Sequence, residues 1–378
     1  MKPRLLFVVN VDWFFLSHRL PIALEASRSG YEVHLATAIT DKLDILKNHD
    51  LVVHPLALDR SGMNLVSALR TFVQIWQLFR FVKPNLVHLV TIKPVVLGGL
   101  AARLARVPAV VVAISGLGFV FVAQGWLATL RRWLVGGLYR VVFGHSNLKV
   151  IFQNQDDQFQ VTKLTGLPTQ SMVLIRGSGV DLEQYRYMPL PDDRLPVVML
   201  AGRLLVDKGV REFVQAAKIL KNAGVMARFV LVGTLDPDNP SSLSEHELMH
   251  WADEGVVELW GQRPDMYQAL AESQIVVLPS YREGLPKILI EAAACGRVVV
   301  TTDVPGCRDA ILPGITGFLV PVCDDQALAE NILQLLENRV LCESMGKAGR
   351  VFAERVFDVR QVVEKHLQIY NELLEKVK

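Results

Sequence analysis

The sequence predicts an α/β protein built from two doubly wound parallel sheets, each covered by helices on both faces. Short apolar and β-branched runs alternate with longer amphipathic segments, which is the pattern of repeated strand–helix units. The chain of 378 residues exceeds the size of one ordinary hydrophobic core. A proline-rich, charged segment at 188–196 separates two such series. We therefore expect a linker there, between domains over 1–187 and 188–356.

The first series contains five expected strands. They are short apolar runs at 4–10, 32–36, 86–90, 109–114 and 149–153. The expected helices carry apolar residues at helical spacing, at 19–29, 64–82, 95–105 and 126–142. Gly30 and Pro84 follow the first two helices and end them.

The second series repeats the pattern after the linker. Its expected strands lie at 197–202, 228–233, 256–260, 275–279 and 298–302. Helices at 210–220 and 288–295 follow the first and the fourth of these strands. Repeated strand–helix units of this kind form a second parallel sheet.

Charge divides the chain into a basic and an acidic half. Residues 1–186 hold 20 Lys and Arg against 11 Asp and Glu, whereas the remainder holds 20 against 27. From Arg60 to Gln155 there are 11 basic residues and no acidic one. A basic surface favours an anionic lipid, a diphosphate or a nucleic acid.

One uncharged segment, from Val107 to Leu130, is long enough to cross a bilayer. Its first part predicts a buried parallel strand, and the glycines of Ser115–Gly118 and Gln124–Gly125 interrupt the rest. We therefore expect no transmembrane helix. We also expect no signal peptide, because the apolar run at 5–9 is short and no cleavage site follows it.

The segment 126–140 allows two interpretations. An apolar helical face with arginines beside it would suit a helix lying in an anionic membrane surface. An ordinary packed helix with solvated arginines fits the same residues, and the absence of acidic residues favours the membrane. The face and its arginines are Trp126, Leu130, Trp133 and Leu134 with Arg131, Arg132 and Arg140.

The cysteines indicate a reducing compartment. The chain has four, none in a close pair, which is typical of free thiols in the cytoplasm. They are Cys295, Cys307, Cys323 and Cys342.

Two glutamates, Glu283 and Glu291, stand eight positions apart after the expected strand at 275–279. Glu283 falls in a strand-to-helix loop, where α/β sheets bind ligands. The N–H groups of Gly284 and Leu285 would point from the helix start toward an anion. Glu291 could reach the same ligand from the helix. An acidic helix start with an unrelated second acid is the alternative interpretation.

A second strand-to-helix loop, from Gly202 to Gly209, carries two cations. Arg203 offers a planar fork and Lys208 a point charge, and together they suit a diphosphate. A surface loop with routine basic residues is the alternative. The position of both cations at the carboxyl end of a strand favours the diphosphate.

The pattern His246-Glu247-x-x-His250 matches that of zinc hydrolases, with Glu247 as the base. The expected apolar stripe of this helix leaves both histidines near its edge, and no third ligand is obvious, since Glu272 is a candidate only by its distance along the chain. We therefore expect a solvated helix and no metal site.

Apart from this histidine pattern, the motifs together resemble the signature of the GT-B-fold retaining glycosyltransferases of family 4. The resemblance rests on Gly202-Arg203, Lys208-Gly209, Glu283-x7-Glu291, Ser178–Asp181, Thr301–Gly306 and Gly314–Val320. The first half resembles a narrower set, N-acetylgalactosaminyltransferase-like, that extends polyprenyl-diphosphate-linked oligosaccharides. That match rests on Ser17–Pro21, Ser115–Phe119 and Gln124-Gly125.

The resemblance implies a retaining transfer of a sugar, such as an N-acetylhexosamine, from a UDP-sugar. The acceptor would be a polyprenyl-diphosphate-linked saccharide of surface polysaccharide biosynthesis, at the cytoplasmic face of the plasma membrane. Domain 1–187 would bind the acceptor and face the membrane, and 188–356 would bind the nucleotide sugar. The last helix, about 357–378, would pack back on the first domain.

The resemblance also implies a role for individual residues of the donor site. Arg203 and Lys208 neutralise the departing diphosphate, so neither a metal nor another cofactor is expected. Glu283 lies near the donor sugar, and Glu291 holds the ribose hydroxyls. Backbone at Gly202, Gly284 and Leu285 meets the phosphate or sugar. Arg263 is a base-site candidate, with a surface arginine as the alternative.

On the acceptor side the chain departs from the family pattern. Loop 10–19 replaces a glycine-rich loop, and its Asp12, His18 and Arg19 are acceptor-side candidates. Arg19 could equally open the first helix. Gly116 and Gly118 are the other candidates, in a loop where many relatives carry a histidine and this chain has none. We therefore assign no catalytic histidine.

Other functions remain to be weighed. A UDP-sugar epimerase of the same fold would need flanking acid and base residues that we cannot assign. A non-catalytic assembly scaffold is disfavoured by the four charged residues of the motifs, and a zinc hydrolase by its missing third ligand. Nucleic-acid binding is not expected, because no matching motif is present.

Overall fold

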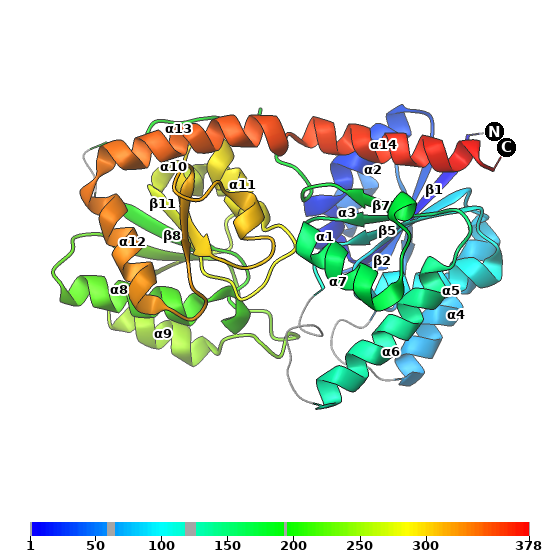
Figure 1. Cartoon of the computed structure of the whole chain (residues 1–378), viewed down its shortest axis with the longest axis horizontal. Coiled ribbons are helices and arrows are strands. Elements are labelled where there is room, and N and C mark those ends of the chain that lie inside the picture. Colours follow the sequence, from blue (N-terminus) through cyan, green and yellow to red (C-terminus); the bar gives the residue numbers. More distant parts are fainter. Residues whose placement is uncertain (1, 59–64, 118–125, 193–194, 378) are drawn as a thin grey trace. The chain divides into compact units, whose positions relative to one another are not determined.

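The computed structural model describes residues 2–58, 65–117, 126–192 and 195–377, with the side chains of 126–132 left out. The chain forms two compact units, Met1–Ser178 with Val359–Lys378, and Gly179–Asp358. The chain crosses from one unit to the other at 178/179 and back at 358/359. The boundaries predicted from the sequence were 187/188 and 356/357. Figure 1 shows both units as α/β layers. The predicted fold class, two doubly wound parallel sheets, is confirmed.

The sheet of the first unit is parallel throughout, in the order β3-β2-β1-β4-β5-β6-β7. The order reverses between β1 and β4, which makes their carboxyl ends the ligand-binding edge. The strands are β1 Arg4–Val11, β2 Glu32–Ala38, β3 Val52–Pro55, β4 Leu86–Val90, β5 Ala109–Ile114, β6 Leu148–Phe152 and β7 Met172–Leu174.

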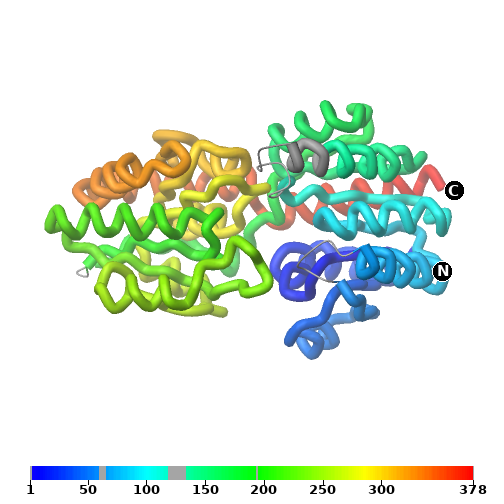
Figure 2. The backbone as a smooth tube through the Cα atoms, turned by 90° about the horizontal axis from the view of Figure 1, so that it is seen from below, coloured from blue at the N-terminus to red at the C-terminus, as the bar shows by residue number. Residues whose placement is uncertain are grey.

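Helices cover both faces of this sheet, because its strands are apolar on both sides. In β1, Phe7 packs in the core beneath α1, α2 and α14, while Leu6 and Val8 face α4, α5 and α6. Figure 2 shows α4 and α5 side by side. The helices are α1 Asp12–His18, α2 Leu20–Arg28, α3 Leu43–Lys47, α4 Leu65–Val82, α5 Ile92–Ala105, α6 Trp126–Phe143, α7 Gln155–Thr165 and α14 Val359–Glu375.

The last helix, α14, belongs to the first unit and lies beside α2 (Figure 1). The Tyr370 hydroxyl lies 2.6 Å from Nδ1 of His88 on β4. Tyr31 donates to Asn371 over 2.7 Å, and Asn147 donates to the Leu373 carbonyl over 2.8 Å. These contacts join the end of the chain to residues on β4 and directly before β2 and β6.

The second sheet is also parallel, in the order β10-β9-β8-β11-β12-β13, and reverses between β8 and β11. Helices α8 and α12 contribute to the core on one face, and α10 and α11 to the core on the other. The strands are β8 Val197–Ala201, β9 Arg228–Val232, β10 Glu258–Gly261, β11 Ile275–Leu278, β12 Val298–Thr302 and β13 Gly317–Val320. The helices are α8 Val210–Asn222, α9 Glu245–Asp253, α10 Met266–Glu272, α11 Lys287–Ala294, α12 Asp325–Glu337 and α13 Arg339–Val356.

Two local expectations were wrong. The expected loop at 10–19 contains helix α1. The expected linker at 188–196 is packed into the second unit: Leu190 lies in its core, and the buried Arg297 donates to the carbonyls of Met188 and Pro189 over 3.1 and 3.0 Å. The prolines and charged residues correctly indicated a segment without regular secondary structure. They did not indicate that this segment is packed against the second unit. The short strands β3, β7 and β13 were missed.

No described helix is long and apolar enough to span a membrane. The uncharged segment 107–130 begins with β5 and ends in α6. Its middle, with the predicted breaks at Gly118 and Gln124-Gly125, lies outside the described residues.

The buried pair His88 and His366 predicts acid sensitivity. Burial lowers the pKa of His88 well below its usual value, and lowers the pKa of His366 to about 3; the charge of Arg19 adds to both. Both imidazoles stay neutral when folded, but take up protons in the unfolded chain below about pH 6.5. The contribution of these two groups to the free energy of unfolding is therefore fully present above that pH. It decreases toward pH 3, by up to about 1.4 kcal/mol per pH unit for each group.

Urea denaturation at pH values from 7.5 to 5 measures this slope. His366→Gln should flatten it. Equal slopes in the wild type and His366→Gln would show that this histidine does not titrate as described.

Candidate active site

The candidate site lies at the carboxyl ends of β8 and β11, the adjacent strands between which the second sheet reverses. The loop after β8 runs through Gly202 and Arg203 to a 3-10 turn at Val206–Lys208, and α8 follows. The loop after β11 carries Ser280 and Glu283 and leads into α11. Two of the predicted motifs, distant in sequence, therefore meet at one edge of the sheet.

Two glycines allow the loop after β11 to pack closely on two neighbouring loops: Gly209 in the loop after β8, and Gly306 in the loop after β12. Gly209 has φ +72°, and a Cβ there would lie 2.2 Å from the Pro279 carbonyl oxygen. Gly306 has φ +81°, and its Cβ would lie 2.6 Å from the carbonyl oxygen of Glu283. Any other residue at either position would displace the backbone. Gly209 thus lets the loop that carries Lys208 approach the loop that carries Glu283.

Lys208 and Glu283 form an ion pair across the point where the strand order reverses. The Ser280 hydroxyl also donates to Glu283 Oε1, over 2.8 Å. The side chains of Lys208 and Glu283 are only 19% and 12% exposed. Their charges are therefore weakly screened by water, and a charged ligand at this edge would interact strongly with them.

Arg203 is oriented by Asp236, which follows β9. Its Nη1 donates to Asp236 Oδ2 over 2.8 Å, and its side chain is 43% exposed while Asp236 is buried. The carboxylate holds one edge of the guanidinium, which stays accessible at the carboxyl end of β8.

Glu291 lies on α11 and is 5% exposed. Lys287, one turn earlier, lies 2.8 Å from its Oε1. Tyr185 hydrogen-bonds to the same carboxylate; burial raises the pKa of Tyr185, and Glu291 raises it further. This carboxylate is thus held in place by a cation and a phenol.

The remaining donor-side candidates lie in loops. Arg263 donates to both carboxylate oxygens of Asp265, over 2.7 and 2.8 Å, and this contact raises the pKa of Arg263. It also lies 3.5 Å from Glu272. Helix α11 begins at Lys287, after Gly284 and Leu285. The N–H groups of Gly284 and Leu285 therefore lie outside its first turn, contrary to the expectation.

Comparison with known proteins agrees with this geometry. The family described as "Glycosyl transferases group 1" matches residues 195–338, and the family "Glycosyl transferase 4-like" matches 4–148. The Anabaena protein HepE, solved in complex with UDP, superposes with a TM-score of 0.78 at 19% identity, covering 98% of this chain and all of that one. A sucrose-phosphate synthase from Thermosynechococcus elongatus superposes with a TM-score of 0.80 at 20% identity, over 99% of this chain and all of that one.

The chain therefore carries a glycosyl transferase 4-like domain followed by a group 1 glycosyl transferase domain, in the GT-B fold. The predicted transferase activity is thereby confirmed.

Two relatives match this glycosyltransferase along nearly its whole length. A Campylobacter jejuni protein is 28% identical over 96% of this chain and 99% of its own; it is an N,N'-diacetylbacillosaminyl-diphospho-undecaprenol alpha-1,3-N-acetylgalactosaminyltransferase. The capsular polysaccharide glycosyltransferase CapM of Staphylococcus aureus is 25% identical over 92% of each chain.

The acceptor-side candidates of the glycosyltransferase differ in their surroundings. Asp12 is buried and binds the Thr40 N–H over 2.7 Å and the Thr40 hydroxyl over 2.8 Å, so its carboxylate fastens the loop after β2. His18 stacks on Phe14 with ring centroids 4.1 Å apart. Arg19 points into the unit and is buried. Gly116 has φ +108°, and Gly118 lies outside the described residues.

The zinc-hydrolase pattern has a structural explanation. Glu247 forms a capping box with Ser244 at the start of α9 and lies 2.8 Å from Nη2 of Arg211. His246 and His250 are exposed on this helix. Across the described ranges, no group of three or more His, Cys, Asp and Glu could hold a metal ion.

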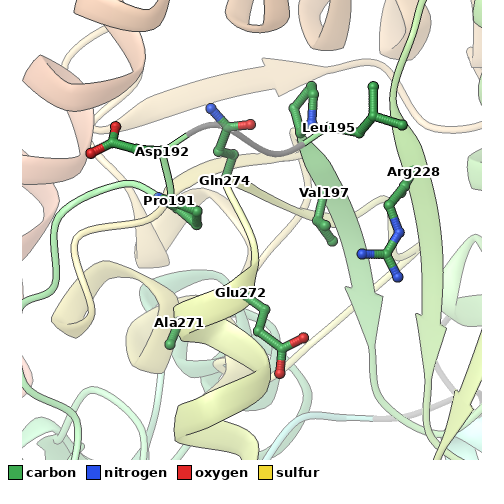
Figure 3. Close-up of a pocket in the computed structure, with 9 residues that line it drawn as sticks. Pro191, Asp192, Leu195, Val197, Arg228, Ala271, Glu272 and Gln274 are labelled. Carbon is green, nitrogen blue, oxygen red and sulfur yellow. The ribbon is translucent and has the colours of Figure 1, made fainter.

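One pocket, of about 290 Å³, lies away from this chemistry (Figure 3). Val197 and Arg228, which begin β8 and β9, contribute to its wall. The pocket is therefore at the amino edge of the sheet, opposite Arg203. It shares no residue with the candidate site.

Sequence reasoning missed four supporting residues: Asp236, Ser280, Lys287 and Tyr185. Lys287 and Glu291 stand at i and i+4, a spacing that could have indicated their contact. Tyr185 reaches Glu291 through the tertiary fold, and no local pattern indicates it.

Replacing Lys208 by Met should destabilise the second unit, because it leaves the Glu283 carboxylate largely buried without its cation. We expect a loss of up to about 3 kcal/mol of unfolding free energy. The double variant Lys208→Met, Glu283→Gln should recover part of it. Urea denaturation followed by tryptophan fluorescence measures both.

Lys218→Met, in the more exposed pair with Glu254, is the matched control and should change stability little. Additive losses in the double variant would mean that Lys208 and Glu283 do not interact.

Proposed function

We propose that this glycosyltransferase moves an N-acetylhexosamine from a UDP-sugar to a polyprenyl-diphosphate-linked saccharide, with retention of anomeric configuration. The observation that carries the proposal is the Lys208–Glu283 pair at the reversal of the second sheet, with Arg203 in the same loop after β8 as Lys208. The name of the full-length Campylobacter jejuni relative supports the acceptor and the sugar. The complex of HepE with UDP supports the nucleotide.

The donor-site residues suit the departure of a diphosphate. Breaking the anomeric C–O bond places negative charge on the leaving group. Lys208 has three N–H donors and can bind a phosphate oxygen while it stays paired with Glu283. Arg203 presents a fork for two phosphate oxygens. Such preorganised cations stabilise the developing charge directly, and we propose that transfer needs no metal ion.

Glu283 and Glu291 are proposed to bind the rest of the donor. A carboxylate accepts hydrogen bonds from neighbouring hydroxyls. Glu283, adjacent to Lys208, would accept from the hydroxyls of the sugar, and Glu291 from those of the ribose. Retention would follow if the leaving phosphate takes the proton of the acceptor hydroxyl on the same face of the sugar.

We also propose that the first unit docks on the anionic, cytoplasmic face of the plasma membrane, where a lipid-linked acceptor lies. Leu65, Val66 and Leu69 on α4 are 83%, 75% and 63% exposed, and Trp133 and Leu134 on α6 are 67% and 51% exposed. Both helices fall in the segment 60–155, which has basic residues and no acidic one. Exposed apolar side chains among cations suit an anionic lipid surface.

A transfer assay tests the function. The purified protein is incubated with UDP-N-acetylgalactosamine, UDP-N-acetylglucosamine, UDP-galactose or UDP-glucose and a polyprenyl-diphosphate-linked monosaccharide, with and without EDTA. We expect an α-linked lipid disaccharide, equal in amount with EDTA. Conversion of the UDP-sugar without any acceptor would instead indicate an epimerase. Loss of transfer with EDTA would contradict the metal-free mechanism.

Arg203→Ala should lower kcat by roughly 10²–10³-fold, because it removes a cation from the departing diphosphate. Steady-state kinetics with saturating acceptor measure the change. Arg228→Ala is the matched control: Arg228 also pairs with a carboxylate, Glu258, but at the amino edge of the same sheet. An equal loss in both variants would point to a general structural effect rather than to Arg203.

Removing apolar side chains from α6 should weaken membrane binding. We expect Trp133→Ser with Leu134→Ser to reduce co-sedimentation with phosphatidylglycerol-containing vesicles by about tenfold or more, since each side chain contributes burial energy. The control pair Val340→Ser and Val351→Ser changes exposed residues of α13 in the other unit. Unchanged binding in the α6 variant, or equal binding to pure phosphatidylcholine, would contradict this docking surface.

A further inference from the structure

Tyr281 lies in the loop after β11, two residues before Glu283. Its backbone N–H donates to the Asp207 carbonyl over 2.9 Å. Its hydroxyl donates to Glu212 Oε1 over 2.6 Å. Asp207 directly precedes Lys208, and Glu212 follows Lys208 by four residues, in the first turn of α8. Tyr281 therefore holds the chain on both sides of Lys208.

The hydrogen bond between Tyr281 and Glu212 is of the strong, charge-assisted kind. Its length of 2.6 Å lies in the range of O–H donors bound to a carboxylate. Burial raises the pKa of Tyr281, and the bond to Glu212 raises it further, so the phenol keeps its proton at neutral pH. Glu212 Oε2 is buried and has no hydrogen-bond partner. Across the ranges that the structure describes, the Tyr281 hydroxyl is thus the one donor to this carboxylate.

The loop that carries Tyr281 is also fixed on its other side, to β12 and the loop after it. The Thr302 hydroxyl, at the end of β12, donates to the Ser280 carbonyl. The Glu283 N–H donates to the Pro305 carbonyl over 3.2 Å. The segment 280–283 is therefore anchored to the sheet, and Tyr281 joins the loop after β8 to this anchored segment.

A third loop meets the same hydroxyl. The Cys323 thiol, in the loop after β13, lies within hydrogen-bond reach of the Tyr281 hydroxyl. Cys323 has φ +59°, in the left-handed region that residues other than glycine seldom adopt. Such strain persists only where the surrounding structure holds it, and it is concentrated near functional sites. Three loops at the carboxyl edge of the second sheet therefore converge on one hydroxyl.

The placement of Lys208 matters because of the step in which it acts. Its ammonium is carried on a flexible four-carbon chain, so the backbone on either side must be fixed if the charge is to be fixed. The charge is needed when the leaving diphosphate becomes more negative, in the transition state. An interaction that is realised only in the transition state changes kcat, whereas uniform binding changes KM.

We propose that Tyr281, fixed by Glu212, is a positioning residue for sugar transfer, which places Lys208 and Glu283 for the departing diphosphate. This assignment rests on the proposed function, which gives Lys208 its role. The hydroxyl of Tyr281 is engaged by Glu212, so Tyr281 acts through the two loops that it joins. Its loss should lower kcat and leave the KM for the lipid acceptor unchanged.

Steady-state kinetics test this role, with a polyprenyl-diphosphate-linked monosaccharide and whichever of the four UDP-sugars of the transfer assay wild type uses best. Tyr281→Phe removes only the hydroxyl, and we expect kcat to fall by roughly ten- to hundredfold, since a misplacement of about 1 Å can cost that much. Glu212→Ala removes the other partner and should give the same loss. Glu212→Gln keeps an oxygen that accepts from the hydroxyl and should retain most of the rate.

The matched control is Tyr187→Phe, which removes the hydroxyl of a 39% exposed tyrosine in the same unit and should leave kcat unchanged. A wild-type kcat in Tyr281→Phe would overturn the proposal. Thermal melting of each variant sets an assay temperature at which all of them are folded.

A double variant separates positioning from general support of the fold. If Tyr281 acts through Lys208, adding Tyr281→Phe to Lys208→Met should lower kcat no further than Lys208→Met does alone. Losses that multiply would show that Tyr281 supports the fold or acts elsewhere, and would overturn the proposal.

A stability measurement distinguishes this proposal from the function on which it rests. The coupling between Lys208→Met and Glu283→Gln in urea denaturation should be smaller in a Tyr281→Phe background, because the two loops are no longer joined at the hydroxyl. If wild type forms no lipid product but the coupling is smaller, the proposed function is wrong and the positioning by Tyr281 stands. If wild type forms the product and Tyr281→Phe changes neither kcat nor the coupling, the inference is wrong and the function stands.

Discussion

The ion pair between Lys208 and Glu283 is the contact on which this account depends. Its partners come from loops that only the strand order brings together, since β8 and β11 are adjacent in the sheet but distant in the sequence. Gly209 then lets the loop after β8 approach the loop after β11, because a side chain there would meet the Pro279 carbonyl oxygen. Gly306 lets the loop after β12 pack on the Glu283 backbone in the same way. The fold thus places a cation and a carboxylate, both largely buried, where a parallel sheet binds its ligand.

The two units use the same topology with different electrostatics. In each sheet the strand order reverses once, and a cation lies at that edge. In the second unit the cations are balanced by Glu283 and Asp236. In the first unit Arg19 has no such carboxylate among the described residues. A balanced site is stable when empty, whereas an unbalanced one gains stability when an anion binds.

Much of the fold and the centre of the site could be predicted from the sequence. Buried parallel strands are apolar runs with clear ends, so most strand positions were correct within a residue or two. Lys208 and Glu283 were found because strand-to-helix loops are where such sheets bind ligands. Contacts that depend on tertiary packing could not be predicted: Tyr185 reaches Glu291, Arg297 fastens the segment expected as a linker, and Arg19 turns inward from a helix junction that was expected as a loop.

The most direct test of the central claim is a crystal structure of the protein with UDP. The account predicts the diphosphate at the carboxyl ends of β8 and β11, with a phosphate oxygen within hydrogen-bond distance of Lys208 Nζ and of the Arg203 guanidinium. Glu291 should accept from the ribose hydroxyls. UDP bound elsewhere, for example in the pocket at the amino edge of the second sheet, would contradict the assignment of the donor site.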